Sequence, residues 1–206
     1  MRLFAFAIAL LTACSACGTT SSNLTGPAPT MSDPAVAKLL VNDEGSCTMW
    51  KTTDDLVVTA GHCCDVGTVY GGHGSHVIPG SIFTVLVDDD VHDVCVLHGK
   101  MIGKPITIAM YDPQVGERIW SAGFPRGKFL ISDGFWSGRD EGDRGICSSV
   151  VGFGASGSPI LNLQGESVGV LIKRFGDMDN LTFVAPIEWV KRAIFKARLM
   201  PAASES

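Results

Sequence analysis

Residues 57–63 read Val-Val-Thr-Ala-Gly-His-Cys, a short apolar run that ends at a glycine and a histidine. Comparable runs of β-forming residues recur from residue 35 onward, with turn pairs such as Gly71-Gly72, Pro79-Gly80 and Asp112-Pro113 between them. They lie at 77–78, 83–87, 94–97, 118–120 and 168–172. Short strands at this spacing predict an all-β fold, either a barrel or a sandwich.

The end of the chain follows a different pattern. Ile187, Val190, Ile194 and Leu199 recur at roughly helical spacing, and Pro186 suits a first helical turn. We therefore expect a C-terminal helix over about 186–198, followed by a short frayed tail at 201–206.

The composition describes a folded, mildly acidic chain. It has 206 residues, 46% of them hydrophobic and 18% charged, with a net charge of −5. Such a balance favours a packed domain over a disordered one. No run of five or more basic residues occurs, which argues against a nucleic-acid partner. Seven cysteines are many for a chain that stays in a reducing cytosol.

The first residues predict export. Residues 1–13 begin Met-Arg, continue with an apolar run and are typical of a signal peptide. The sequence Leu11-Thr12-Ala13-Cys14 resembles the lipobox of bacterial lipoproteins, which implies a lipidated Cys14 and a membrane anchor. An ordinary signal peptide, and hence a secreted or periplasmic protein, is the alternative. Residues 14–34 are rich in Ser, Thr, Gly and Pro and predict a flexible linker.

Three segments carry the residues of nucleophilic catalysis. Besides 57–63 they are 92–97, His-Asp-Val-Cys-Val-Leu, and 154–159, Gly-Ala-Ser-Gly-Ser-Pro. A serine hydroxyl needs a neighbouring base, an imidazole can be that base, and a carboxylate can hold the imidazole in one tautomer. We expect these roles to fall to Ser156, His62 and Asp93, with the N–H groups of Gly154 and Ser156 as the oxyanion hole. Each residue alone would more often be a turn or core residue.

In this order, the three segments closely resemble signature segments of the trypsin-like serine proteases. The Ser-Gly-Ser-Pro stretch and Gly123-Phe124-Pro125 are most similar to the bacterial glutamyl-endopeptidase and HtrA-type branches. The resemblance runs from about Gly45 to the C-terminal helix. It implies a chymotrypsin-like fold of two antiparallel six-stranded β-barrels, at about 44–108 and 114–186, in a protease domain over 35–200. It also implies a serine endopeptidase that hydrolyses protein or peptide substrates without a cofactor.

The resemblance bears on the cysteines as well. In many of these proteases a disulfide links the places of Cys47 and Cys63, although the adjacent Cys64 could compete for Cys47. Cys95 lies in an apolar run, so a buried free thiol is expected there. The sequence also leaves open a bridge from Cys147 to Cys64 or to Cys95.

Two departures from trypsin concern activation and specificity. Ala155 stands before the serine, where trypsin has the acid that its new N-terminus binds on activation, so no such zymogen switch is expected. Val150, six residues before Ser156, brings no acidic charge to the specificity pocket. The pocket is then apolar, or it is shaped by the expected strands at 168–174 and 180–185, where Thr182 is a candidate pocket residue. Lys173 and Arg174 either favour acidic side chains nearby or are solvated.

Two other kinds of protein fit parts of the sequence. One is a binding module that kept the protease fold without activity. The other is a zinc-binding lipoprotein built on the His and Cys residues at 62, 63, 64, 73 and 76 together with Asp65. Two cysteines without a spacer give poor geometry for one tetrahedral ion, so we expect no metal.

Overall fold

The computed structural model describes residues 35–41, 45–64, 68–71, 81–149, 152–175 and 178–200. The expected signal peptide, the linker, Cys14, Val150 and the tail lie outside these residues. None of the helices in the described ranges is long and apolar enough to cross a membrane.

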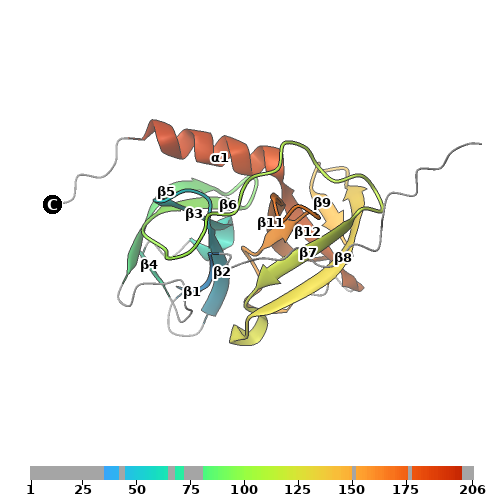
Figure 1. The fold of residues 1–206 in the computed structure, drawn as a ribbon, viewed down its shortest axis with the longest axis horizontal. Helices are drawn as coiled ribbons and strands as arrows, with labels where there is room; N and C mark the ends of the chain where they lie inside the picture. Colours follow the sequence, from blue (N-terminus) through green and yellow to red (C-terminus); the bar gives the residue numbers. More distant parts are fainter. Residues whose placement is uncertain are drawn as a thin grey trace, which may run out of the picture.

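Six antiparallel strands form the first closed barrel, in the order β1-β2-β3-β6-β5-β4 (Figure 1). They are β1 (Val36–Val41), β2 (Gly45–Lys51), β3 (Leu56–Ala60), β4 (Thr68–Gly71), β5 (Ile82–Asp89) and β6 (Val94–His98). The short 3₁₀ helix η1 (Gly61–Cys63) follows β3. The barrel begins at Val36 rather than near residue 44, because β1 pairs with β2 along its whole length and also closes the barrel against β4.

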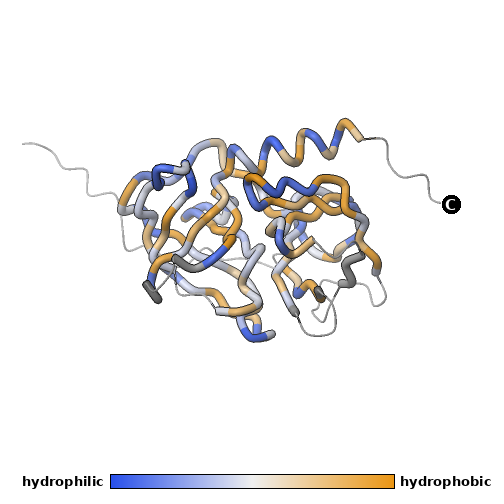
Figure 2. Tube along the Cα trace, turned by 180° about the vertical axis from the view of Figure 1, so that it is seen from behind, coloured by the Kyte–Doolittle hydropathy of each residue, from blue (hydrophilic) through white to orange (hydrophobic). Residues whose placement is uncertain are grey.

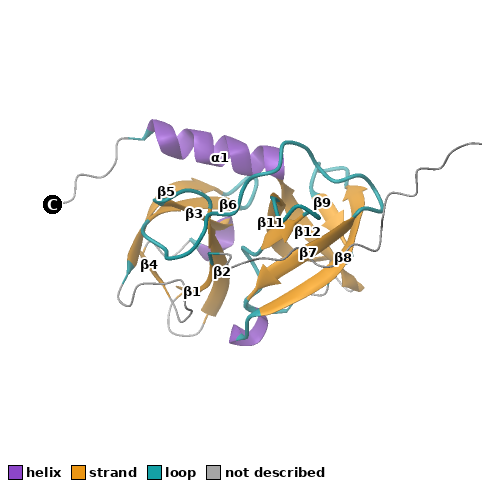
Figure 3. Ribbon diagram, viewed as in Figure 1, coloured by secondary structure: helices purple, strands orange, loops and turns teal. Residues whose placement is uncertain are grey.

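The second barrel has the same number of strands, in the order β10-β11-β12-β9-β8-β7. They are β7 (Arg118–Gly123), β8 (Leu130–Arg139), β9 (Gly145–Cys147), β10 (Pro159–Leu161), β11 (Ser167–Phe175) and β12 (Met178–Pro186). The turn η2 (Pro125–Gly127) joins β7 to β8. Figure 3 shows that strands make up both halves of the molecule, with one long helix above them. The predicted chymotrypsin-like fold of two six-stranded barrels is confirmed.

The helix α1 (Ile187–Leu199) follows β12 directly, yet it packs on β5 and β6 of the first barrel as well as on β11 and β12 of the second. Its buried side chains recur at helical spacing, and Figure 2 shows apolar and polar residues alternating along it. They are Ile187, Trp189, Val190, Ala193, Ile194 and Ala197. The helix begins one residue later than expected, because Pro186 has extended backbone angles and stands at the N-cap.

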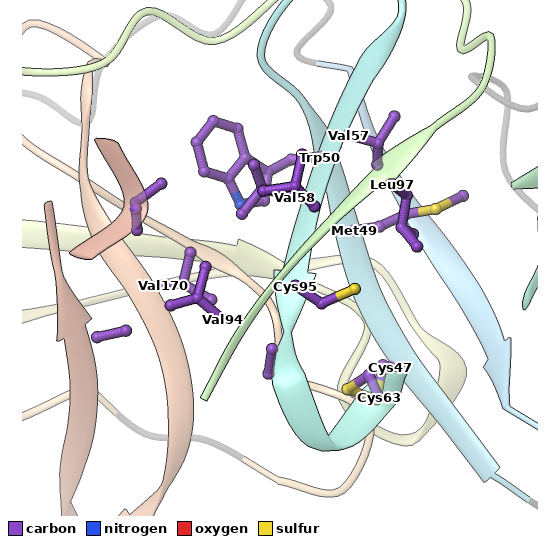
Figure 4. Close-up of a cluster of buried hydrophobic side chains, with 14 of the residues drawn as sticks. Cys47, Met49, Trp50, Val57, Val58, Cys63, Val94, Cys95, Leu97 and Val170 are labelled. Atoms are coloured by element: carbon purple, nitrogen blue, oxygen red, sulfur yellow. A yellow bond between two sulfur atoms is a disulfide. The ribbon is translucent and has the colours of Figure 1, made fainter. Parts of the chain in front are cut away.

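The core is continuous across the two barrels. All five residues of β3 are buried, and β3 contacts β11 of the second barrel. Figure 4 shows Val58 of β3 beside Trp50, Val57 on the other side of the same strand near Leu97, and Val94 of β6 close to Val170 of β11. Burying one large apolar side chain is worth about 1.5–3 kcal/mol. This shared core fixes the position of one barrel against the other, which matters because residues from both barrels meet at the site described next.

Candidate active site

The ends of two neighbouring strands bring His62 and Asp93 together. The antiparallel register pairs Ala60 of β3 with Val94 of β6, so the residues just beyond them meet at one end of the first barrel. Gly61 lies directly against this end, since a Cβ atom on it would come within 3.1 Å of the backbone of Asp93. A side chain at position 61 would therefore push His62 away from the carboxylate.

His62 and Asp93 are joined by three hydrogen bonds. The ring Nδ1 of His62 lies 2.9 Å from Oδ1 and 3.1 Å from Oδ2 of Asp93, and the backbone N–H of His62 donates to Oδ1 across 2.9 Å. Asp93 holds this position with a positive φ of 54°, a conformation that Asp tolerates better than most residues. The arrangement gives the carboxylate two donors on a single residue.

The charge state of Asp93 decides the tautomer of His62. Burial alone would raise the pKa of the Asp93 carboxyl. The hydrogen bonds from the ring and backbone N–H of His62, with the charges of His62 and Lys173, lower this pKa below its usual value instead. The ionised carboxylate only accepts hydrogen bonds, so Nδ1 of His62 carries the hydrogen and Nε2 carries the lone pair. An imidazole in this tautomer can act as a base through Nε2.

Ser156 lies in the loop between β9 and β10, against the end of β3. Its carbonyl accepts the backbone N–H of Thr48 across 2.7 Å, and its Oγ lies 3.5 Å from the carbonyl oxygen of Ile172. The next residue, Gly157, has a φ of 87°, and a Cβ atom on it would lie 2.0 Å from the carbonyl oxygen of Thr48 and 3.1 Å from the nitrogen of Ala60. Only glycine fits, so the loop carrying Ser156 packs tightly beside the strand that leads to His62.

The peptide before Gly154 is oriented by a turn of the second barrel. The carbonyl of Phe153 accepts the backbone N–H of Arg126 in η2 across 2.6 Å. In a trans peptide the N–H points opposite to the carbonyl, so the N–H of Gly154 points away from η2. Within the described part of the chain, neither this N–H nor that of Ser156 donates to another protein group.

Thr48 of β2 connects this loop to the first barrel, and sequence reasoning missed it. The residue is fully buried. Its hydroxyl donates to the carbonyl of Gly154 across 2.8 Å and accepts the backbone N–H of Phe124 across 2.9 Å. Its own carbonyl accepts the hydroxyl of Thr59 across 2.8 Å. No local pattern marks this residue, because its partners are distant in sequence.

A cavity of about 490 Å³ opens beside the His62–Asp93 pair. Its other lining residues come from the β5–β6 turn, the second barrel and α1: Asp90, Val91, His92, Arg144, Ile172, Lys173 and Trp189. Of the residues expected to shape a substrate pocket, Lys173 lines this cavity. Thr182 does not, because it is fully buried and its hydroxyl donates to the carbonyl of Ser149 across 2.9 Å.

A second His–Asp pair lies at the rim of this cavity. Nδ1 of His92 is 2.9 Å from Oδ1 of Asp89, and the ring of His92 lies 4.5 Å from that of Trp189 in α1. Residues 90–93 form a turn rather than part of a strand. The alternation of side chains along a strand therefore does not apply to His92 and Asp93, and both residues line the cavity.

Four cysteines surround the turn that carries His62. The expected Cys47–Cys63 disulfide is present, and a second disulfide joins Cys64 to Cys95. The expectation of a free thiol at Cys95 is therefore wrong: Thr59 is the residue of β3 opposite Cys95, and the helical turn η1 after β3 brings Cys64 within bonding distance of Cys95. Cys147 is the free thiol among the described residues, and burial raises its pKa to about 11.

The disulfides also bear on metal binding. The sulfur atoms of Cys47 and Cys63 and a ring nitrogen of His62 all lie within 4.8 Å of one another. Because both sulfurs are already bonded to each other, they are not thiolate ligands in this structure. Asp65, His73 and His76 lie outside the described residues.

Comparison with solved structures gives several neighbours that share the fold. The serine endoprotease from Yersinia pestis matches with a TM-score of 0.71 at 19% identity, over 80% of this chain and 62% of that one. The active form of the Rv3671c protease from M. tuberculosis matches with a TM-score of 0.69 at 22% identity, over 83% and 84% of the two chains. An HtrA-type protease with a tripeptide matches with a TM-score of 0.67 at 17% identity, over 79% and 59%. The chain thus spans less than two thirds of the Yersinia and HtrA-type chains.

Comparison of the sequence itself gives one family. No curated protein sequence matches the chain. The trypsin-like peptidase domain matches residues 45–170, which cover both disulfides, the His62–Asp93 pair and the loop of Ser156. The chain therefore belongs to the trypsin-like peptidase domain family.

Proposed function

We propose that the chain is a serine endopeptidase with His62, Asp93 and Ser156 as its catalytic triad. The observation that carries the proposal is the hydrogen bonding of His62 to an ionised Asp93, beside the glycine-flanked loop of Ser156. Asp88, Asp89 and Asp90 precede Asp93 closely in sequence, but the carboxylate that meets His62 is that of Asp93. The carboxylate holds the imidazole in the tautomer that a general base needs.

The proposed reaction is acyl transfer to Ser156. Nε2 of His62 takes the hydroxyl proton as Oγ of Ser156 attacks the scissile carbonyl, and the same imidazole, now protonated, returns the proton to the leaving amine. Asp93 stabilises the positive charge in between. Water then attacks the acyl-enzyme, with the imidazole of His62 taking a proton from the water and returning a proton to Oγ of Ser156. The proposed reaction requires no cofactor.

The N–H groups of Gly154 and Ser156 are the proposed oxyanion hole. The orientation of the Phe153–Gly154 peptide supports this role, because Arg126 binds the carbonyl and leaves the N–H on the opposite side. One donor of this kind typically contributes ~3–4 kcal/mol of transition-state stabilisation.

We also propose that the enzyme has no zymogen switch of the trypsin type. Ala155, which precedes Ser156, is buried in the apolar core of the second barrel and carries no carboxylate for a new N-terminus to bind. Removal of the signal segment would then suffice for activity.

For specificity, the cavity beside His62 supports a preference for acidic side chains. Lys173 is exposed and faces this cavity, and Arg144 lines the same wall. Nζ of Lys173 lies 5.7 Å from the centroid of the Phe183 ring, and Cζ of Arg144 lies 4.0 Å from it. Arg144 is already paired with Asp140, so Lys173 is the proposed contact for a substrate carboxylate.

A serine-directed fluorophosphonate probe tests the triad. Wild-type protein should be labelled, and labelling should disappear in Ser156→Ala. Ser158→Ala is a matched control, since Ser158 lies in the same loop but is buried. It should still be labelled. A folded wild type that takes no label would overturn the proposal and favour a binding module without activity.

The location of the protein follows in part from its disulfides. Two disulfides in one small domain are typical of a protein outside the reducing cytoplasm. Within that compartment we propose a lipoprotein anchored through Cys14. Intact-mass analysis of the protein from the membrane fraction should show that Cys14 is the N-terminal residue and carries acyl chains. A soluble mature form without this modification would contradict the lipoprotein proposal.

A further inference from the structure

Two consecutive cysteines follow His62, and their disulfides run to different strands. Cys63 is bonded to Cys47 in β2, and Cys64 is bonded to Cys95 in β6. The Cα–Cα distances are 6.3 and 6.5 Å. Figure 4 shows Cys47 and Cys63 close together, with Cys95 of β6 above them in this view. The turn that carries His62 is thus fixed covalently from two sides.

The second of these disulfides closes a ring around the His62–Asp93 hydrogen bonds. Cys64 is the second residue after His62, and Cys95 is the second residue after Asp93. The covalent path from His62 to Asp93 through the disulfide is therefore short, and the hydrogen bonds of 2.9 and 3.1 Å complete it. Any outward movement of η1 relative to the start of β6 has to stretch this ring.

Asp93 needs such support more than an ordinary strand residue. It has a φ of 54° in the turn before β6, where side-chain-bearing residues are uncommon. Its side chain remains 26% exposed, and that of His62 43%, so packing alone does not enclose the pair. The Cys64–Cys95 disulfide lies two residues after each of them. It therefore limits how far His62 and Asp93 can move apart when the backbone relaxes or water enters between them.

We infer that the Cys64–Cys95 disulfide is a positioning brace that holds His62 and Asp93 at hydrogen-bonding distance. This role rests on the proposed function of the pair. The bridge is a permanent brace rather than a redox switch, because Cys64 is only 3% exposed and Cys95 is fully buried. A thiolate must reach a sulfur atom to open a disulfide, so reduction requires the fold to open first.

The test compares Cys64→Ala/Cys95→Ala with the control Cys147→Ala, which removes a buried sulfur of the second barrel without removing a crosslink. Hydrogen exchange of the His62 backbone N–H reports directly on its bond to Asp93. We expect this exchange to accelerate about tenfold or more in the double variant, at a temperature where circular dichroism shows it folded. We also expect probe labelling of Ser156 to slow about tenfold or more from misplacement of the base. Both rates should stay within twofold of wild type in Cys147→Ala.

A folded double variant with wild-type exchange and labelling would overturn the brace. If the double variant does not fold, Cys64→Ser/Cys95→Val takes its place, because valine refills the buried volume at Cys95 without restoring the crosslink. The exchange rate of the His62 N–H and the labelling rate of Ser156 should change in this variant as stated for the first. Wild-type rates in the folded variant would contradict the inference. If the wild type takes no label, the proposed function is wrong. The exchange rates of the His62 N–H in the wild type and the double variant still test whether the disulfide holds His62 against Asp93.

Discussion

The hydroxyl of Thr48 donates a hydrogen bond to the carbonyl of Gly154 across 2.8 Å, joining two residues that are 106 apart in sequence. The same oxygen accepts the N–H of Phe124, so a single buried side chain links β2, the end of β7 and the loop before Ser156. The loop that presents the proposed oxyanion donors therefore depends on the first barrel for its position.

Thr48→Val tests this link, because valine keeps the shape and removes the hydroxyl. The substitution leaves the carbonyl of Gly154 and the N–H of Phe124 without a partner. Each unsatisfied buried group costs about 1–3 kcal/mol of stability. We expect kcat to fall about tenfold, equivalent to ~1.4 kcal/mol, as the Gly154 N–H shifts. Thr48→Ser, which keeps the hydroxyl, should restore kcat. A Thr48→Val enzyme with reduced thermal stability but normal kcat would limit Thr48 to a structural role.

Asp93→Asn isolates the charge of the carboxylate. Asparagine tolerates a φ of 54° as well as aspartate does, so the backbone of the turn should be preserved. Its amide can donate to Nδ1 of His62 and so favour the tautomer that cannot act as a base through Nε2. We expect kcat to fall by about 10³- to 10⁴-fold with little change in KM. Steady-state kinetics on a peptide substrate would check this, and a loss below tenfold would argue for another carboxylate.

The lowered pKa of Asp93 also makes stability depend on pH. A carboxyl whose pKa is lower in the folded than in the unfolded state, where it is about 3.9, adds stability at higher pH. This stabilisation is fully present above the pKa of the unfolded state and is lost as the pH falls through the lower pKa of the folded state. The difference in Tm between wild type and Asp93→Asn should therefore shrink between pH 6 and pH 2. The pKa values of Asp133 and Asp140 are also lowered, by hydrogen bonds from Arg118 and Arg144 against the effect of burial, so the wild-type curve alone would not isolate Asp93.

The sequence predicted local features well and long-range ones poorly. His62 and Ser156 stand in segments whose flanking residues, Gly61 and Gly157, are required by contacts that the structure shows. Thr48 escaped notice because its role depends on two partners, Gly154 and Phe124, that only the folded chain brings near.

The misassigned cysteine has a related cause. An apolar run predicts burial, which is correct for Cys95, but burial does not reveal a covalent partner across a strand pair. The bridge depends on the pairing of β3 with β6 together with the turn η1 that follows β3, and neither strand shows this combination alone. The first strand was likewise missed because pairing with β2 and β4, rather than local pattern, defines it.

Lys173→Glu tests the proposed acidic preference. Lys173 lines the cavity beside His62, and replacing its charge would repel a carboxylate that the lysine attracts. We expect kcat/KM to fall about tenfold for peptides with an acidic residue in this cavity and to change little for neutral peptides, a difference of ~1.4 kcal/mol. Cleavage profiles of a peptide library with both enzymes would measure it. Identical profiles would exclude Lys173 from substrate recognition.

Gly157→Ala should be far more harmful than a glycine substitution at a similar backbone angle elsewhere. Gly157 and Gly116 have φ values of 87° and 86°, so the conformational strain of alanine, about 1–2 kcal/mol, is shared by both. A Cβ atom at Gly116 meets nothing within 4 Å, whereas one at Gly157 would lie 2.0 Å from the carbonyl oxygen of Thr48. We expect Gly116→Ala to lower Tm by a few degrees and to keep full labelling at Ser156. Gly157→Ala has to separate the loop of Ser156 from β2, so it should either fail to fold or fold without labelling. Equal losses in Tm for the two variants, with labelling intact, would show that the loop can move away from Thr48 without consequence for the site.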